Sequence, residues 1–386
     1  DIELPLIDVL VALELNGVAV DVEALESLRR FVSKKIKNGE RKIWRLAGEE
    51  FNINSTQQLR SVLFDRLQLP TTDIKKTQSG FSTAASELEK LRAHHEIIRL
   101  IEQHRELSKL LNTYIDTLPE LVDEKTERIY GQFNQVVAAT GRLSSQDPNF
   151  QNIPILTELG QEIRAAFVAP RGRRLVKADY SQIELRLAAH MSQDKKMIDV
   201  FRQGGDIHRA TAAWVFGIDP DVVSDKQRRE AKTLNFGVLY GMGPQAFARA
   251  AGISLEEARA FIGRYQEQYK QLTHFISETI DFAAEHGYVE TLFGRKRYVP
   301  ELESNNPAVR AAAERAAFNF PLQGTAADLL KKAMIDLQAE IEANFPDVKM
   351  VLTVHDELVC EVPKDTVEKF SKRMREIMES VMTLDI

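Results

Sequence analysis

Two short segments of the chain place carboxylates where apolar strands are expected to end. Asp179 follows an apolar run at 175–178, and a polar turn at 355–357 contains Asp356 and Glu357. Apolar, β-branched runs that are bounded by polar residues are typical of strands. Mg2+ takes oxygen ligands, commonly one or two carboxylates together with phosphate and water. Carboxylates at the edges of one sheet would therefore suit a two-metal phosphoryl-transfer site.

Each group also has a structural interpretation. Asp179 precedes a helix that is expected from about residue 182, and Asp is a frequent helix N-cap. The segment 355–357 would equally fit an ordinary polar turn, although tight hairpins favour Asn-Gly or Asp-Gly and this turn contains no glycine. Both interpretations stay open at this point.

A third constellation combines two cations and two aromatic rings at intervals of four residues. Its members are Arg228, Lys232, Phe236 and Tyr240. Residues four apart lie along one helix face, and Ser224 followed by Gln227 predicts a capping-box start just before them. Cations suit a triphosphate, and aromatic rings suit the face of a base or sugar. The alternative is a core helix with a snorkelling basic end.

The residue pattern predicts the elements that position these groups. They are a helix and short strand at 1–20, a helical arm at 21–118 with an amphipathic helix from Leu88 to Ile115 closed by Pro119, β-like segments at 123–180 that include 128–137, helices at 182–345, a hairpin at 349–362 and a helix at about 366–382. A small sheet is thus drawn from separate parts of the chain, which indicates an α+β fold.

Composition narrows the class of protein. The chain has 386 residues, which fits one large multi-lobed unit or two to three domains, and 44% of them are hydrophobic, enough for a substantial buried core. The chain contains no run of 18 or more apolar residues, so a membrane-spanning helix is not expected. Its single cysteine, Cys360, excludes an internal disulfide. The net charge of -6 argues weakly against nucleic-acid binding. Net charge is a blunt test, because what matters is where the positive charge lies. Each local basic cluster alone is more typical of a solvated helix face or loop, but an acidic protein with basic strips could hold DNA on one side.

Several segments resemble, in order along nearly the whole chain, the signatures of family A DNA polymerases, the group of bacterial DNA polymerase I. They are Thr140–Ser145, Asp147–Asn149, Gln151–Pro154, Val176–Arg186, Asp206–His208, Arg228–Gly241, Gln323–Asp328 and Val354–Leu358. The resemblance implies a right-hand architecture with a palm on a small antiparallel sheet, a helical thumb and helical fingers. The implied boundaries are palm at 1–20, 119–186 and 346–386, thumb at 21–118, and fingers at 187–345.

The resemblance also implies roles for individual residues. Asp179, Asp356 and the Tyr180 carbonyl would hold two Mg2+ ions, for which Mn2+ is expected to substitute, and Glu357 would be an auxiliary acid. The residues implied to contact the incoming dNTP are Gln182, Glu184, His208, Arg228, Lys232, Phe236 and Tyr240. The residues implied to contact primer or template are Arg142, Asn149, Asn152, Arg315, Asn319, Gln323 and His355.

Some of these roles are specific. Lys232 would also protonate the leaving group, Phe236 would disfavour dideoxynucleotides, and Tyr240 would stack beside the template base. Glu184 would crowd a ribose 2′-hydroxyl, and its alternative is a solvated helix carboxylate. Asn319 and Gln323 would alternatively cap neighbouring groups on one helix face.

The implied activity is templated addition of dNTPs to a primer 3′-hydroxyl with release of pyrophosphate. The expected partners are primer–template DNA and dNTPs, without a membrane, for a monomer in the bacterial cytoplasm. We expect no proofreading or 5′-nuclease domain in this chain, and a family C-terminal tail that is absent after Ile386. The alternatives are a single-subunit RNA polymerase, against which Glu184 and Phe236 argue, and a catalytically silent DNA-binding fragment, against which the intact Asp179 and Asp356 argue.

Overall fold

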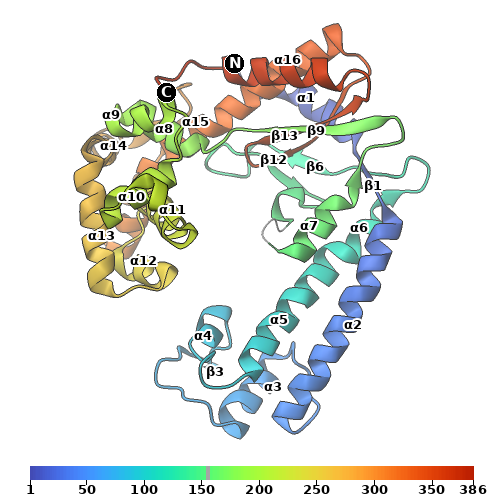
Figure 1. The fold of residues 1–386 in the computed structure, drawn as a ribbon, viewed down its shortest axis with the longest axis vertical. Helices are drawn as coiled ribbons and strands as arrows, with labels where there is room; N and C mark the ends of the chain where they lie inside the picture. Colours follow the sequence, from blue (N-terminus) through green and yellow to red (C-terminus); the bar gives the residue numbers. More distant parts are fainter. Residues whose placement is uncertain (154–156) are drawn as a thin grey trace. The chain divides into compact units, whose positions relative to one another are not determined.

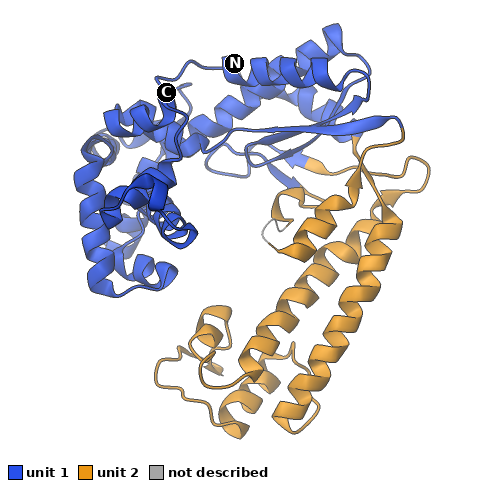
Figure 2. Ribbon diagram, viewed as in Figure 1, with its two compact units in different colours: residues 1–16, 133–145, 172–386 blue, residues 17–132, 146–171 orange. Residues whose placement is uncertain are grey.

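The chain forms two compact units, each assembled from separate pieces of sequence (Figure 2). The computed structural model describes residues 1–153 and 157–386, so Pro154 of the segment Gln151–Pro154 lies outside the described residues. Unit 1 contains residues 1–16, 133–145 and 172–386, and unit 2 contains residues 17–132 and 146–171. Helices dominate both units, and their sheets are small and antiparallel. The predicted α+β class is confirmed.

Two helices form the arm of unit 2. α2 (Val22–Ala47) and α5 (Ile97–Leu110) lie side by side (Figure 1). Asp21 caps α2 by accepting a hydrogen bond from the Ala24 N–H (2.9 Å). The apolar faces of both helices share a core with the short helices α3 (Thr56–Arg60) and α4 (Ala85–Glu89).

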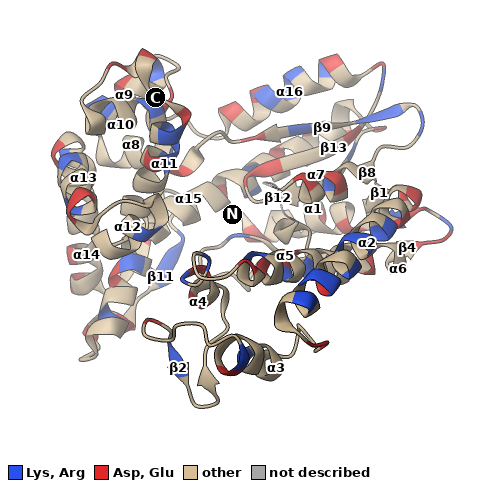
Figure 3. Cartoon of the chain, turned by 60° about the horizontal axis from the view of Figure 1, so that its bottom comes forward, with Lys and Arg blue, Asp and Glu red and all other residues tan. Residues whose placement is uncertain are grey.

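The solvent side of α2 is strongly basic, as the blue segments in Figure 3 show. Its exposed cations are Arg29, Arg30, Lys34, Lys35, Lys37, Arg41, Lys42 and Arg45. The helix is thus apolar toward the unit 2 core and cationic toward water, as expected for a surface helix.

Two predictions for this region are wrong. The expected helix from Leu88 to Ile115 is interrupted, because α4 ends at Glu89 and α5 begins at Ile97, before a π-helical turn at Leu111–Ile115. Pro119 does not close that helix but lies in α6 (Thr117–Glu120), within a first turn where proline is tolerated.

A four-stranded sheet completes unit 2. Its order is β4 (Val122–Asp123), β5 (Arg128–Ile129), β1 (Val18–Val20) and β8 (Phe167–Val168). The strand expected in 1–20 therefore forms but groups with unit 2. The β-like segment 128–137 is only partly confirmed: β5 and β6 (Gln132–Asn134) form, whereas Val136 and Val137 are exposed outside any strand. The other short elements near it are β7 (Ser144–Gln146), a 3-10 turn at Phe150–Asn152 and α7 (Glu158–Ala165).

Unit 1 is built on a three-stranded sheet in the order β12 (Lys349–Val354), β13 (Glu357–Pro363) and β9 (Arg173–Asp179). α1 (Glu3–Asn16) packs on β12, and α16 (Val367–Ser380) packs on β9 and β13. Cys360 lies fully buried in β13, and this burial raises the pKa of its thiol. The predicted hairpin and final helix are confirmed.

The remaining helices of unit 1 share one apolar core. They are α8 (Ile183–Ser192), α9 (Lys195–Arg202), α10 (Ile207–Phe216), α11 (Asp225–Leu239), α12 (Pro244–Ala251), α13 (Leu255–Gln268), α14 (Lys270–His286) and α15 (Pro307–Asn344). A hairpin of β10 (Tyr288–Glu290) and β11 (Lys296–Tyr298) packs against α14 and α15. Among the described helices, none has the length and apolar character needed to cross a membrane.

Candidate active site

The end of the unit 1 sheet brings the predicted carboxylates together. Asp179, the last residue of β9, pairs directly with Glu357, the first residue of β13. The Tyr180 N–H donates a hydrogen bond to the Asp356 carbonyl (3.2 Å), which ties the turn to the neighbouring strand. The N-cap of α8 is Gln182, and its side chain makes no capping hydrogen bond. The alternative that Asp179 caps this helix is therefore wrong.

The turn that carries Asp356 has an unusual backbone. His355 adopts a positive φ of 53° between β12 and β13. Tight hairpin turns often need such a conformation, which usually selects glycine. A non-glycine residue in this conformation costs free energy and is found preferentially at functional sites. The backbone at 355–357 is therefore compatible with a functional segment and with an ordinary hairpin turn.

Asp179 and Asp356 at this edge both have raised pKa values. Partial desolvation, followed by the negative charges of Asp356 and Glu357, raises the pKa of Asp179. Burial raises the pKa of Asp356, and the nearby Arg142 opposes that shift. Glu357 pairs with Lys177 (3.1 Å). A cation bound between Asp179 and Asp356 would relieve both effects.

The donor atoms at this edge suit a hard divalent cation. Two carboxylates and the nearby Tyr180 carbonyl offer only oxygen, which Mg2+ prefers. Within the described residues, no group of three or more His, Cys, Asp or Glu side chains forms a ready metal cage. A cation here would therefore complete its coordination with water or substrate oxygens, as Mg2+ commonly does with phosphates.

Glu184 lies beside the carboxylates, in the first turn of α8. It is only 5% exposed, so the alternative of a solvated carboxylate is wrong. Its Oε1 accepts a hydrogen bond from Arg142 Nη2 (2.6 Å), and its Oε2 accepts one from the Tyr240 hydroxyl. Burial raises the pKa of Glu184, against the pull of the Arg142 charge.

Arg142 links Glu184 to the sheet edge. The same Nη2 that donates to Glu184 lies 3.8 Å from Asp356 Oδ1. Its Nε is buried without a hydrogen-bond partner among the described residues. A buried donor without a partner is costly.

The cation–aromatic strip, formed by Arg228, Lys232, Phe236 and Tyr240, follows α11 as predicted. Ser224 and Gln227 form the expected capping box. The helix ends at Leu239, so Tyr240 is its C-cap rather than a residue of the last turn. The rings of Phe236 and Tyr240 stack with centroids 6.1 Å apart. Arg228 bonds to Asp206 (2.6 Å), whereas Lys232 is exposed.

His208 lies next to this strip on α10. It is 2% exposed, its ring centroid is 5.6 Å from that of Phe236, and its Nδ1 contacts Asn235 Nδ2 at 2.9 Å. Burial lowers the pKa of His208 to about 4, with Arg228 and Lys232 acting against the opposing charge of Asp206. The side chain is thus a neutral imidazole at neutral pH. Asn235 is a partner that sequence reasoning missed.

The predicted DNA contacts fall in both units. Arg315, Asn319 and Gln323 project from α15, where Asn319 Oδ1 is buried without a partner among the described residues, so it does not cap a neighbour. Arg315 packs against Gly241, because a Cβ there would lie 2.6 Å from Arg315 Cγ. Asn149 and Asn152 belong to unit 2: the Asn149 side chain caps a 3-10 turn, and the Asn152 carbonyl accepts a hydrogen bond from the Tyr114 hydroxyl (2.5 Å).

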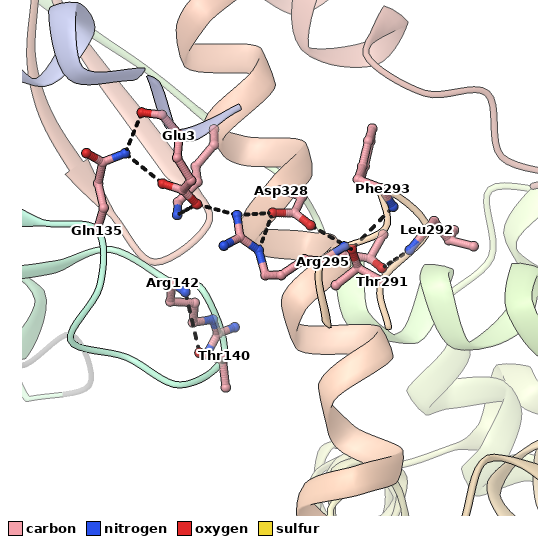
Figure 4. Close-up of polar contacts among 11 residues, drawn as sticks. Glu3, Gln135, Thr140, Arg142, Thr291, Leu292, Phe293, Arg295 and Asp328 are labelled. Atoms are coloured by element: carbon pink, nitrogen blue, oxygen red, sulfur yellow. Dashed lines mark hydrogen bonds and ion pairs between the residues drawn. The ribbon is translucent and has the colours of Figure 1, made fainter. Parts of the chain in front are cut away.

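Sequence reasoning also missed a partly buried charge cluster in unit 1. Its members are Glu3, Arg295 and Asp328, which Figure 4 labels, and Lys331, which pairs with Glu3. The hint in the sequence was that Asp328 ends the segment Gln323–Asp328, which belongs to the family resemblance. No role was assigned to Asp328 itself.

Comparison with known proteins gives a consistent answer. The model of "DNA polymerase family A" matches residues 22–386. The thermostable DNA polymerase I of Thermus filiformis is 50% identical over 100% of this chain and 46% of that protein. DNA polymerase I of Pseudomonas aeruginosa is 47% identical over 100% of this chain and 42% of that protein. The chain spans about half the length of the curated relatives it matches.

A solved structure supports the same relationship. The POL domain of Pol1 from M. smegmatis, in complex with DNA primer-template and dNTP, superposes with a TM-score of 0.94 and 39% identity, over 100% of this chain and 68% of that one. This likeness confirms the predicted polymerase architecture. With the family model matching nearly every residue, the chain belongs to DNA polymerase family A.

Proposed function

We propose that this chain is a DNA-directed DNA polymerase that adds dNTPs to a primer 3′-hydroxyl along a DNA template. The observation that carries the proposal is the pair Asp179 and Asp356 at one sheet edge, with Arg142 and the buried Glu184 beside them. Family membership supports the reaction class, and the neighbour's complex with DNA primer-template and dNTP supports the choice of substrates.

Asp179, Asp356 and the Tyr180 carbonyl would hold two Mg2+ ions, for which Mn2+ would substitute. When bound, such ions supply Lewis-acid activation of the 3′-hydroxyl and neutralise charge on the departing pyrophosphate. Glu357 stays close by through its pairing with Asp179 and its ion pair with Lys177. It would keep the edge negative without ligating directly.

The strip on α11 would bind the nucleotide. Asp206 accepts from Arg228 Nε, which leaves the guanidinium Nη groups available for phosphate oxygens. Lys232 is exposed and can deliver a proton to the pyrophosphate oxygen that leaves. The neutral His208 would add a hydrogen bond without a charge. Gln182, in the turn before α8, would complete the contacts.

The aromatic and acidic residues would select the nucleotide. Phe236 would lie beside the incoming sugar and base, and Tyr240 beside the template base. Glu184 is buried and held by two partners, so it cannot swing away from a ribose 2′-hydroxyl without breaking both hydrogen bonds. A positioned side chain that crowds one hydroxyl discriminates more strongly than a mobile one.

Primer and template would contact residues of both units. Arg142, Arg315, Asn319, Gln323 and His355 would serve near the growing end, with Asn149 and Asn152 from unit 2. The segment 21–118 would act as the thumb through the cations of α2, 187–345 as the fingers, and 1–20, 119–186 and 346–386 as the palm. Binding through lysines and arginines to phosphates is sequence-independent and weakens as salt rises.

Extension of a labelled primer on a DNA template, with Mg2+ and dNTPs, tests the proposal. We expect templated extension by the wild type and none by Asp356→Ala or the nearly isosteric Asp356→Asn, with duplex binding retained by both variants. Comparable use of rNTPs by the wild type would favour an RNA polymerase. Equal inertness of wild type and variants, with duplex still bound, would favour a DNA-binding fragment.

A further inference from the structure

The partly buried charge cluster joins three separate parts of unit 1 (Figure 4). Asp328, fully buried in α15, accepts hydrogen bonds from Arg295 Nε (2.8 Å) and Nη2 (2.6 Å). Arg295 Nη2 also donates to Glu3 of α1, and Lys331 Nζ lies 2.7 Å from the same carboxylate. Two cations thus face two carboxylates, which balances the charge around the buried Asp328 and Lys331.

The loop that carries Arg295 is fastened to α15. The Thr291 hydroxyl donates to Asp328 Oδ2 (2.8 Å) and accepts from the Arg295 N–H (3.1 Å). The Leu292 N–H donates to the Thr325 hydroxyl (3.1 Å). A Cβ at Gly324 would lie 2.6 Å from Thr291 Cγ2, so only glycine allows this approach. The segment 291–295 is therefore held in one place.

The Arg295 side chain lies in close contact with the loop that carries Arg142. A Cβ at Gly141 would lie 2.9 Å from Arg295 Nε, and Gly141 has a φ of 80°. The next residue, Arg142, reaches Glu184 at 2.6 Å and Asp356 at 3.8 Å. The Arg295 side chain is thus one residue away from a group at the carboxylate edge.

The same cluster also holds the other end of that loop. Gln135 Nε2 donates to Glu3 Oε2 (2.6 Å) and to the Glu3 carbonyl (2.9 Å). Segment 135–142 is therefore attached at Gln135 through Glu3 and at Gly141 through Arg295. Both attachments depend on the same charges.

We propose that Arg295 is a positioning residue for the polymerase reaction. Held by Asp328 and Glu3, it fixes the backbone at Gly141 so that the Arg142 guanidinium stays between Glu184 and Asp356. The proposal rests on the proposed function, since it concerns how that site is kept in working geometry. A displacement of about 1 Å in such a group can cost a hundredfold in rate.

A double-mutant cycle tests the proposal. The specificity constant kcat/KM for dNTP would be measured by single-nucleotide extension for wild type, Arg295→Lys, Arg142→Ala and the double variant. Arg295→Lys keeps the charge but not the planar fork that bonds Asp328 twice, so we expect a loss of about tenfold or more. In the Arg142→Ala background the further loss should vanish, because the group being positioned is gone.

Arg297→Lys is the matched control. Arg297 lies on β11 in the same hairpin, with its guanidinium 5.9 Å from the centroid of the Phe320 ring. We expect it to change kcat/KM less than Arg295→Lys at equal thermal stability. If Arg295→Lys fails to fold, Asp328→Asn replaces it in the cycle, because it removes the carboxylate charge that holds the Arg295 guanidinium while nearly keeping the side-chain shape.

The outcomes separate the two proposals. Losses that multiply in the double variant, or an Arg295→Lys enzyme with wild-type kcat/KM, would overturn the positioning role while leaving the polymerase intact. A wild type that extends no primer would overturn the proposed function, and the positioning role with it. A vanishing second loss would support both.

Discussion

The Tyr240 hydroxyl donates a hydrogen bond to Glu184, joining the C-cap of α11 to the first turn of α8. Glu184 is bound at the same time by Arg142, so both of its oxygens are occupied. The tyrosine ring is in turn stacked on Phe236. Glu184, which is proposed to select the sugar, is thus linked by a hydrogen bond and a ring stack to Tyr240 and Phe236, which are proposed to contact the bases.

Replacement of Glu184 should relax sugar selection. We expect Glu184→Ala to increase rNTP use relative to dNTP by about tenfold or more, because steric discrimination at one group has this size. Glu184→Gln keeps the shape and should retain most of the discrimination. The ratio of kcat/KM for rNTP and dNTP measures the effect. An unchanged ratio in Glu184→Ala would contradict the assignment of Glu184 as the sugar-selecting residue.

Phe236→Tyr should improve dideoxynucleotide use. The added hydroxyl would offer a hydrogen bond where a dideoxynucleotide lacks its 3′-hydroxyl, and one hydrogen bond contributes about 1 kcal/mol, or several-fold in rate. Competition between ddNTP and dNTP in a chain-termination assay reports it directly. Phe282→Tyr is a suitable control, because it adds the same hydroxyl to a partly exposed ring of α14 that has no proposed role at the nucleotide. Equal termination by wild type and Phe236→Tyr would contradict the role.

Lys232→Ala should weaken nucleotide use far more than Lys226→Ala. Both lysines are exposed on α11, but Lys226 lies in the first turn and pairs with Glu230 at 3.7 Å. A charged hydrogen bond to phosphate contributes about 1.5–3 kcal/mol, so a loss of tenfold or more in kcat/KM is expected for Lys232→Ala. Similar losses in the two variants would mean that only general positive charge matters.

His208 should make stability depend on pH between 6.5 and 4. Its folded-state pKa is about 4 and its ordinary value 6.5, so the unfolded chain takes up this proton first. The contribution is complete above pH 6.5 and is lost as the pH falls toward 4. Urea unfolding should show that His208→Gln removes up to about 3 kcal/mol of this dependence.

The exposed His274 provides the matching control for that experiment. Its side chain is 65% exposed and pairs with Glu278. We expect His274→Gln to leave the pH dependence nearly unchanged. A His208→Gln profile parallel to that of the wild type would show that the buried imidazole is not responsible.

Local signals predicted much of unit 1. The strand before Asp179, the hairpin around 355–357 and the capping box at Ser224 each depend on residues close in sequence. Such short-range rules hold because the hydrogen bonds they describe span only a few residues. The meeting of Asp179 and Glu357 did not follow from these rules, because β9 and β13 lie far apart in the sequence and pair only in the folded sheet.

Contacts between distant segments were not predictable in this way. Arg295 meets Glu3 across 292 residues of sequence, and no periodicity marks the two residues as partners. β1 follows α1 directly yet groups with unit 2, because its edge pairs with β5 and β8. The break between α4 and α5 likewise follows packing in the unit 2 core, since the apolar spacing from Leu88 onward reads as continuous.

The burial of Cys360 has a practical consequence for experiments on this protein. A thiol reacts with maleimide dyes as the thiolate, and the Cys360 thiol is both fully buried and raised in pKa. Such a reagent should therefore not label Cys360 in the folded protein. A single cysteine introduced at an exposed position, such as Lys37 of α2, would therefore take up one fluorophore without prior removal of the natural residue.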